Sequence, residues 1–266
     1  MLGSFFYFYL MNNSPIGIFD SGIGGVTIFK SIQKLLPKEN IIYFSDNLNS
    51  PYGNKTKKEI QDLSLKNSEW LRNKRCKTIV VACNTATTNS ISLLRKSFKV
   101  PFIGVEPAIK PAAINTKTGN IGVLATKGTL SSNLFNITSN DYCSKINIIE
   151  KNGDGLVEMI ENGILNGTEI EDLLIKFLNP MIKSNIDHLV LGCTHYPLIK
   201  DSIIKILPSN VKILESGGAV AKQTKKIIIN NNMNSTDNNP YYEFYCNGSD
   251  NSLKKILDNN FKIKTI

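Results

Sequence analysis

The fold is decided first by residues 16–25, which read IGIFDSGIGG. Four small or apolar residues are typical of a buried strand, and the glycine-rich turn after Asp20 leads into a helical pattern from about Val26 to Leu36, which Pro37 ends. A strand followed at once by a turn and a helix is typical of parallel α/β proteins. The turn lacks G-x-G-x-x-G spacing and the P-loop lysine, so a nucleotide site is a weak alternative to a simple tight turn.

The same alternation of strand and helix continues along the chain. Further strands are predicted at residues 41–44, 78–81, 100–105, 188–191 and 211–214, and helices at 57–73, 84–98 and 219–229. This order predicts βα units and a mainly parallel sheet. A last strand at 241–246 and a short helix at 249–259 are expected to return and pack on the first part of the chain.

The opening pattern occurs a second time at residues 120–129, which read NIGVLATKGT. From Gly17 to Cys83 is 66 positions, and from Gly122 to Cys193 is 71. Such spacing favours two repeated α/β halves, although short strand–turn–helix signals can also match by chance. The expected domains are residues 14–106 with 217–266, then 107–216, preceded by an N-terminal tail at 1–13.

Composition narrows the class of protein. Of the 266 residues, 41% are hydrophobic and 20% are charged, as in an ordinary globular protein. The five cysteines are odd in number and form no C-x-x-C pair, which argues against a disulfide framework and structural zinc and favours a reducing cytosol. We therefore expect a cytoplasmic location.

Binding to nucleic acid or to a membrane is not expected to be the main function of the chain. The net charge of +9 permits nucleic-acid binding, but the lysines are scattered and do not form blocks. The longest apolar stretch, at residues 5–11, is far shorter than the roughly 20 residues that a spanning helix needs.

The residues with the clearest chemistry are two cysteines in matching contexts. Residues 80–87 read VVACNTAT and residues 190–197 read VLGCTHYP, so each cysteine follows an apolar strand pattern. A single cysteine is more often a small buried hydrophobe than a base. Two thiols at equivalent strand ends can instead face one cleft, where one removes a proton from a substrate and the other returns a proton to the opposite face.

Neighbouring side chains support this hypothesis. A helix N-terminus after each thiol stabilises the thiolate, and His195 and Asp20 are candidates to relay protons beside Cys193 and Cys83. A papain-like hydrolase is the rival, but residues two apart on one strand end do not by themselves give the geometry of a nucleophile and its base.

Polar residues at the predicted strand ends indicate the ligand. The pairs Asp20-Ser21, Asn84-Thr85 and Thr194-His195 fall where parallel α/β proteins bind ligands. Hydroxyl and backbone N–H groups hold a carboxylate, and an acid with an amide holds an ammonium group. A small ligand with both signs of charge, such as an amino acid, fits this set.

Four motifs taken in order carry a family resemblance. They are residues 17–25, GIFDSGIGG; 51–55, PYGNK; 82–87, ACNTAT; and 192–198, GCTHYPL. From about Pro15 to Gly218 the chain closely resembles the glutamate racemases of the cofactor-independent aspartate/glutamate racemase superfamily. The resemblance implies two pseudosymmetric α/β domains with the active site in the cleft between them.

It also implies roles for individual residues. Cys83 and Cys193 match the two catalytic acid/bases, with Cys83 acting on D-glutamate and Cys193 on L-glutamate. Asp20 and His195 match residues that assist these cysteines. Glu158 resembles an acid that supports the side of the site with Cys193. The matching substrate-binding positions are Asp20, Ser21, Pro51, Tyr52, Gly53, Asn84, Thr85, Thr126, Thr194 and His195. No cofactor or metal is implied, the product would enter peptidoglycan, and a homodimer is expected.

The chain departs from the family pattern before Glu158. Residues 150–155 read EKNGDG where family members usually carry a Cys-Pro element, and Glu215 begins a motif that usually begins with Asp. Three other functions stay open at this point: a binding protein that has lost turnover, a racemase or decarboxylase for another substrate, and a protein with a nucleic-acid partner. The presence of both Cys83 and Cys193 argues against the first.

Overall fold

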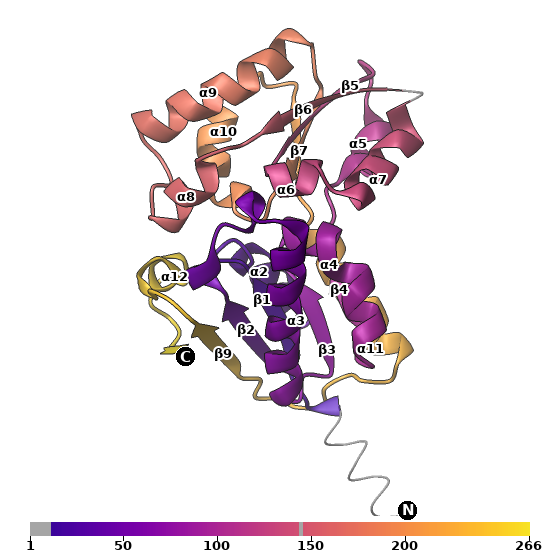
Figure 1. Cartoon of the computed structure of the whole chain (residues 1–266), viewed down its shortest axis with the longest axis vertical. Coiled ribbons are helices and arrows are strands. Elements are labelled where there is room, and N and C mark those ends of the chain that lie inside the picture. The colour runs from indigo at the N-terminus through magenta and orange to yellow at the C-terminus, as the bar shows by residue number, and fades with distance from the viewer. Residues whose placement is uncertain (1–11, 144–145) are drawn as a thin grey trace, which may run out of the picture.

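A computed structural model describes residues 12–143 and 146–266 of the chain (Figure 1). The strands are β1 (Ile16–Asp20), β2 (Ile41–Ser45), β3 (Thr78–Val81), β4 (Phe102–Gly104), β5 (Asn120–Ala125), β6 (Asn147–Asn152), β7 (His188–Gly192), β8 (Lys212–Leu214), β9 (Tyr242–Cys246) and β10 (Ile263–Thr265). They form a six-stranded sheet in the order β10-β9-β2-β1-β3-β4 and a four-stranded sheet in the order β6-β5-β7-β8. All the paired strands in both sheets are parallel. The six-stranded sheet and its helices form the first half of the molecule, and the four-stranded sheet and its helices form the second.

The expected repeat is confirmed by the order of the strands. Within each half, the first strand lies between the second and the third, and the fourth lies beyond the third. Gly17 and Gly122 occupy matching places in β1 and β5, and both are tightly covered. A Cβ atom on Gly17 would lie 2.9 Å from the Cys76 sulfur, and one on Gly122 would lie 2.8 Å from the Met181 sulfur.

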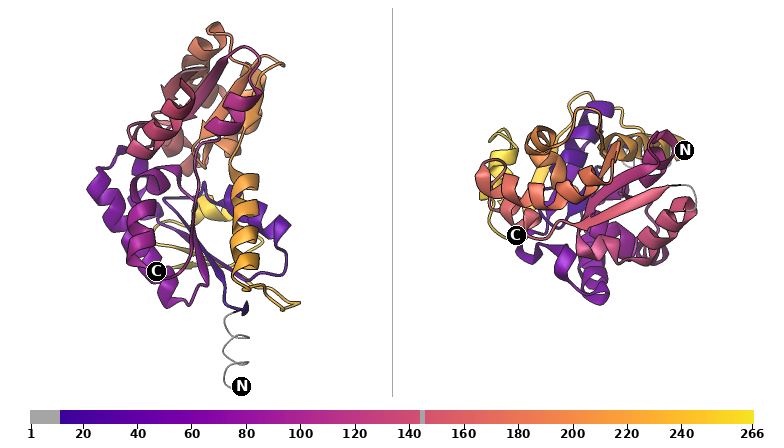
Figure 2. Two further views of the ribbon diagram at one scale, coloured as in Figure 1. Left: turned by 90° about the vertical axis from the view of Figure 1, so that its right-hand side faces the viewer. Right: turned by 90° about the horizontal axis from the view of Figure 1, so that it is seen from above.

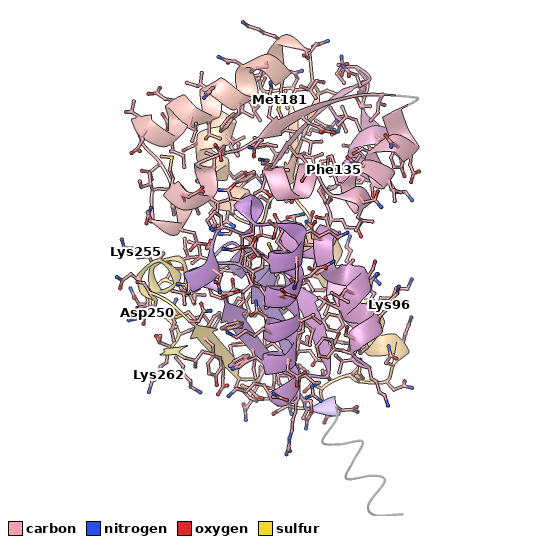
Figure 3. The ribbon with its side chains drawn as sticks, in the orientation of Figure 1. Lys96, Phe135, Met181, Asp250, Lys255 and Lys262 are labelled. Carbon is pink, nitrogen blue, oxygen red and sulfur yellow. The ribbon has the colours of Figure 1, made fainter. Side chains whose placement is uncertain are left out.

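Helices cover both faces of each sheet. They are α2 (Val26–Leu35), α3 (Lys57–Asn73), α4 (Asn84–Ser97), α5 (Ile109–Asn115), α6 (Lys127–Leu130), α7 (Asn133–Cys143), α8 (Leu156–Glu161), α9 (Thr168–Lys183), α10 (Lys200–Ile206), α11 (Gly217–Asn230) and α12 (Asn251–Ile256), with short 3-10 helices η1 (Asn47–Asn49), η2 (Tyr52–Asn54) and η3 (Tyr196–Ile199). In the first half, α2 packs with α11 on one face and α3 packs with α4 on the other (Figure 2). In the second half, α9 and α10 lie together, and α5 packs with α7 on the opposite face. Phe135 of α7 and Met181 of α9, labelled in Figure 3, belong to these two layers.

The sequence explains the central strands and the start of α3. Strands β1, β2, β3 and β7 are buried along their whole length, as expected for parallel strands covered on both faces. Thr56 caps α3, because its hydroxyl accepts a hydrogen bond from the Glu59 N–H while the Glu59 carboxylate accepts one from the Thr56 N–H. This exchange satisfies two backbone donors at the helix start.

The chain passes between the halves twice. It enters the second half between β4 and α5 and returns between β8 and α11. The Ser216 hydroxyl donates a 2.6 Å hydrogen bond to the Glu106 carbonyl oxygen and joins the two crossing segments. After α11 the chain adds β9 beside β2, with Phe244 opposite Tyr43, so the expected return to the first half is confirmed.

Some elements were not predicted. Strand β6 reads NIIEKN and is only partly buried, because it lies at the edge of its sheet, so its sequence has a weak strand pattern. The strand expected at 100–105 is shorter, at Phe102–Gly104. Most of the predicted tail, residues 1–11, lies outside the described residues, but the Asn13 carbonyl accepts a 2.8 Å hydrogen bond from the Asn40 side chain. Among the described residues, none of the helices combines the length and the apolar character needed to span a membrane.

Candidate active site

Cys83 lies where β3 ends and α4 begins. It is the N-cap residue of α4, and its sulfur accepts a 3.4 Å hydrogen bond from the Ala86 N–H. The Ser21 hydroxyl lies 3.5 Å from the same sulfur. Burial, and then the negative charge of Asp20, raise the pKa of the Cys83 thiol well above its ordinary value. Cys83 therefore holds its proton more tightly than an exposed cysteine does.

Cys193 lies at the matching end of β7 and has a different neighbour. Its sulfur is 3.7 Å from Nδ1 of His195, and Nε2 of His195 is 2.5 Å from the Glu161 carboxylate. Burial alone would lower the pKa of His195, but the contacts with Cys193 and Glu161 outweigh it and raise that pKa well above the usual histidine value. The imidazole therefore lies where it can exchange a proton with the Cys193 sulfur.

Asp20 is a fully buried acid at the end of β1. Its carboxylate accepts hydrogen bonds from the N–H groups of Gly25, at 2.5 Å, and Ser21, at 2.7 Å, and from the Thr194 hydroxyl, at 3.3 Å. Burial raises the pKa of Asp20 to about 6, and the nearby His195 opposes that rise. Asp20 thus changes charge close to neutral pH.

The glycine-rich turn after Asp20 serves close packing between the halves. A Cβ atom on Gly22 would collide with the Glu161 carboxylate, and one on Gly24 would lie 2.7 Å from the backbone nitrogen of His195. Both contacts join the first half to the second. The sequence-based preference for a tight turn over a nucleotide loop therefore has a physical reason, since the glycines allow close approach.

A small pocket between the halves brings both thiols to one space. We call it the cleft pocket. It is lined by Ser21, Pro51, Tyr52, Gly53, Cys83, Asn84, Thr85, Thr126, Val157, Cys193 and His195. These residues include most of the predicted substrate-binding positions and one residue, Val157, that was not predicted. Thr194 lies outside this lining, where its hydroxyl holds Asp20, and Asp20 itself is completely buried.

Hydroxyl groups from the two halves meet at one side of the cleft pocket. The Thr85 hydroxyl of α4 lies 2.7 Å from that of Thr126 and 3.2 Å from that of Thr129. The Asn89 amide donates a 2.9 Å hydrogen bond to the Gly128 carbonyl across the same boundary. These contacts form a polar site that can exchange its internal hydrogen bonds for bonds to a carboxylate.

Glu158 does not lie where its predicted role requires. Its carboxylate is 3.3 Å from the Asn54 amide at the rim of the cleft, in a hollow that Lys127 also lines. Glu161, three residues later on α8, contacts His195 instead and also accepts a 2.8 Å hydrogen bond from the Ile23 N–H. The acid that the structure places behind Cys193 and His195 is therefore Glu161. Because the two acids lie one helical turn apart, the sequence alone does not show which of them faces His195.

Asp46 is a second buried acid that was not predicted. It follows β2 and is hydrogen-bonded to the Tyr52 hydroxyl, while the Asn67 amide lies 3.2 Å from its carboxylate. Asn67 also donates to Tyr52, at 3.0 Å. Asp46 thus fixes the ring of Tyr52, which lines the cleft pocket.

Comparison with known proteins agrees with this geometry. The model of the Asp/Glu/hydantoin racemase family matches residues 16–224, which include both cysteines, Asp20, Glu161 and His195. The chain belongs to this family. It is therefore a racemase, with its two thiols at the equivalent strand ends of the two halves.

Individual relatives are similar to this racemase over most of its length. It is 41% identical to a glutamate racemase from Herpetosiphon aurantiacus over 218 residues, which cover 82% of this chain and 86% of the relative. A glutamate racemase isoform from Bacillus anthracis has a similar structure, with a TM-score of 0.86, 32% identity, and 96% and 98% of the two chains covered. The glutamate racemase from Francisella tularensis, solved in complex with D-glutamate, gives a TM-score of 0.85 at 32% identity and covers 96% of this chain and 98% of that one.

Proposed function

We propose that this racemase interconverts L- and D-glutamate by a two-base transfer of the α-proton, with Cys83 and Cys193 as the two bases and no cofactor. The observation that carries the proposal is that both cysteines, at matching strand ends of two repeated halves, line the same pocket. A carbon atom held between them presents one face to each sulfur. That arrangement suits inversion at Cα better than hydrolysis, which needs one nucleophile.

The polar lining of the pocket supports an amino-acid substrate. The hydroxyls of Ser21, Thr85 and Thr126 and the amide of Asn84 are suited to the carboxylates of glutamate. The positive end of the α4 dipole lies at Cys83, where it favours negative charge on the substrate or on the sulfur. Because the cleft pocket is narrow, the substrate is held in little water, which strengthens each of these contacts.

In the L-to-D direction, the Cys193 thiolate removes the α-proton. The C–H bond breaks, its electron pair remains on Cα, and the proton forms an S–H bond on Cys193. The carbanion is stabilised by the surrounding donors. The Cys83 thiol then gives its proton to the opposite face of Cα and becomes a thiolate. The D-to-L direction exchanges the roles of the two sulfurs.

The neighbours of each thiol have separate tasks in this scheme. His195, held by Glu161, stabilises the Cys193 thiolate and accepts or supplies a proton between turnovers. Asp20 performs the corresponding task near Cys83 through Ser21. We assign the supporting role that was expected of Glu158 to Glu161.

We further propose that the product D-glutamate is used in peptidoglycan synthesis and that the enzyme acts in the cytoplasm as a homodimer. The unpaired state of Cys76, Cys83, Cys193 and Cys246 supports a reducing compartment.

The test is incubation of the reduced protein with L-glutamate in D2O without added cofactor, followed by NMR and optical rotation. Deuterium incorporation at Cα together with loss of optical rotation is the expected result. If neither isomer exchanges its α-proton in folded protein, the assignment to glutamate is overturned.

A further inference from the structure

Glu161 is held by both halves of the molecule. It lies at the end of α8 in the second half, where its carboxylate contacts His195. The same carboxylate oxygen accepts a 2.8 Å hydrogen bond from the Ile23 N–H of the first half. In addition, the Glu161 backbone carbonyl accepts a hydrogen bond from the Ser252 hydroxyl of α12, also in the first half. One residue therefore connects His195 to two separate elements across the cleft.

The fit around Glu161 is close. The turn at Gly22 approaches the Glu161 carboxylate so tightly that a Cβ atom there would collide with it. On the other side, a Cβ atom on Gly163 would lie 3.7 Å from the Lys255 ammonium group, so α12 also lies against the turn after α8. Figure 3 labels Lys255 on this edge of the molecule, at the level where the halves meet. The position of Glu161 is consequently set in part by contacts that exist only while the halves are together.

These contacts lie far from the two crossing segments. Figure 1 shows α8 and α12 on one side of the molecule and α11, which follows the second crossing, on the other. When two bodies rotate about their connection, the atoms farthest from it move most. Opening of the cleft therefore separates Glu161 from Ile23 and Ser252 before it disturbs contacts near the crossings.

We propose that Ser252 is a positioning residue, which holds Glu161 against His195 when the halves close and thereby sets the proton transfer at Cys193. This inference rests on the proposed two-cysteine function. A carboxylate that is hydrogen-bonded to an imidazole favours the protonated, charged form of that imidazole. A displaced Glu161 therefore leaves His195 less able to hold a proton. The ionisable groups that interact with His195 are Cys193, Glu161 and Asp20, and only Glu161 is held by α12.

The experiment compares three variants of the full chain. Ser252→Ala removes the hydrogen bond to Glu161, and Ser252→Thr keeps a hydroxyl at the same place. Ser249→Ala is the matched control, because Ser249 is exposed and its hydroxyl bonds within its own segment, to the N–H of Asn251. The chain has two histidines, so NMR can follow the titration of His195 and distinguish it from His188 with a His188→Gln variant.

For Ser252→Ala we expect the His195 titration midpoint and the alkaline limb of the kcat/KM profile to move together to lower pH. We expect kcat to fall roughly three- to tenfold, the effect of one lost hydrogen bond, with little change in KM. Ser252→Thr and Ser249→Ala should retain the wild-type titration. Gly22→Ala displaces the Glu161 carboxylate from the opposite side, so it should shift the titration midpoint of His195 in the same direction. It is the second variant to measure if Ser252→Ala does not fold.

An unshifted titration of His195 in folded Ser252→Ala overturns the inference, even if activity falls and Gly22→Ala shifts that titration, because the role of Ser252 would then be structural only. Failure of the proposed function has a different signature. In that case the wild-type protein shows no α-proton exchange, while the His195 titration still reports whether Ser252 acts on Glu161.

Discussion

The two thiols occupy matching positions, but their surroundings differ. β1 ends in Asp20, whereas the matching strand β5 ends in Ala125, so only the first half has a buried acid at this place. Two residues after each cysteine the chain has Thr85 in the first half and His195 in the second. The two sulfurs thus lie at equivalent strand ends, whereas their polar neighbours differ between the halves. Burial and the nearby carboxylate of Asp20 raise the pKa of the Cys83 thiol, whereas the Cys193 sulfur lies 3.7 Å from the ring of a histidine.

Replacing each thiol in turn tests this comparison most severely. Cys83→Ser and Cys193→Ser should each reduce racemisation by roughly 10³- to 10⁴-fold, the upper part of the range for a lost acid/base. In D2O, Cys83→Ser should still exchange the α-proton of L-glutamate, and Cys193→Ser that of D-glutamate, each without inversion. NMR of both isomers measures this. Identical behaviour of the two variants toward both isomers would break the distinction between the faces.

The next largest effect concerns Asp20. Asp20→Asn should reduce kcat about 10²-fold, because the first-half thiol loses its nearby charged group. In the wild-type protein, Asp20 gains a proton as the pH falls through about 6, so activity should decline below that pH. The kcat/KM profile should therefore have an acid limb near pH 6. If Asp20→Asn keeps this limb, the limb belongs to another group.

A third test compares two glycines for stability. A Cβ atom on Gly25 would lie 2.7 Å from Asp20 Cβ and 2.9 Å from the Tyr43 hydroxyl, whereas one on Gly218 would meet no atom within 4 Å. Gly25→Ala should lower the free energy of unfolding by about 1–3 kcal/mol, and Gly218→Ala should not. Urea denaturation measures both. Equal stability of the two variants would mean that the turn beneath Asp20 can relax freely.

The smallest expected effect is at Ser21. Its hydroxyl lies 3.5 Å from the Cys83 sulfur and lowers the pKa of that thiol, against the larger effects of burial and Asp20. Ser21→Ala should therefore slow kcat in the D-to-L direction, where Cys83 acts as the base, by roughly threefold. Steady-state assays in both directions test this. An equal or larger loss in the L-to-D direction would contradict the assignment of Cys83 to the D-isomer.

The sequence alone predicted the parallel α/β halves and both cysteines. These depend on local signals, since an apolar strand followed by a turn and helix identifies a strand end without long-range information. Glu161 was missed because the choice between it and Glu158 depends on Ile23 and His195, which approach α8 only in the folded chain. Asp46 was missed for the same reason, because its partners Tyr52 and Asn67 come from η2 and α3.

The two crossing segments restrict how the halves can move. A body attached at one point can turn about three axes, but a body attached at two points can turn only about the line between them. The second half is attached at residues 105–108 and 215–216, and the Ser216 hydrogen bond to Glu106 keeps these attachments together. Relative motion is thereby reduced to few degrees of freedom. We therefore expect that the halves, when they close, bring the two sulfurs back to the same separation and alignment, as the proposed proton transfer at either face of one carbon atom requires.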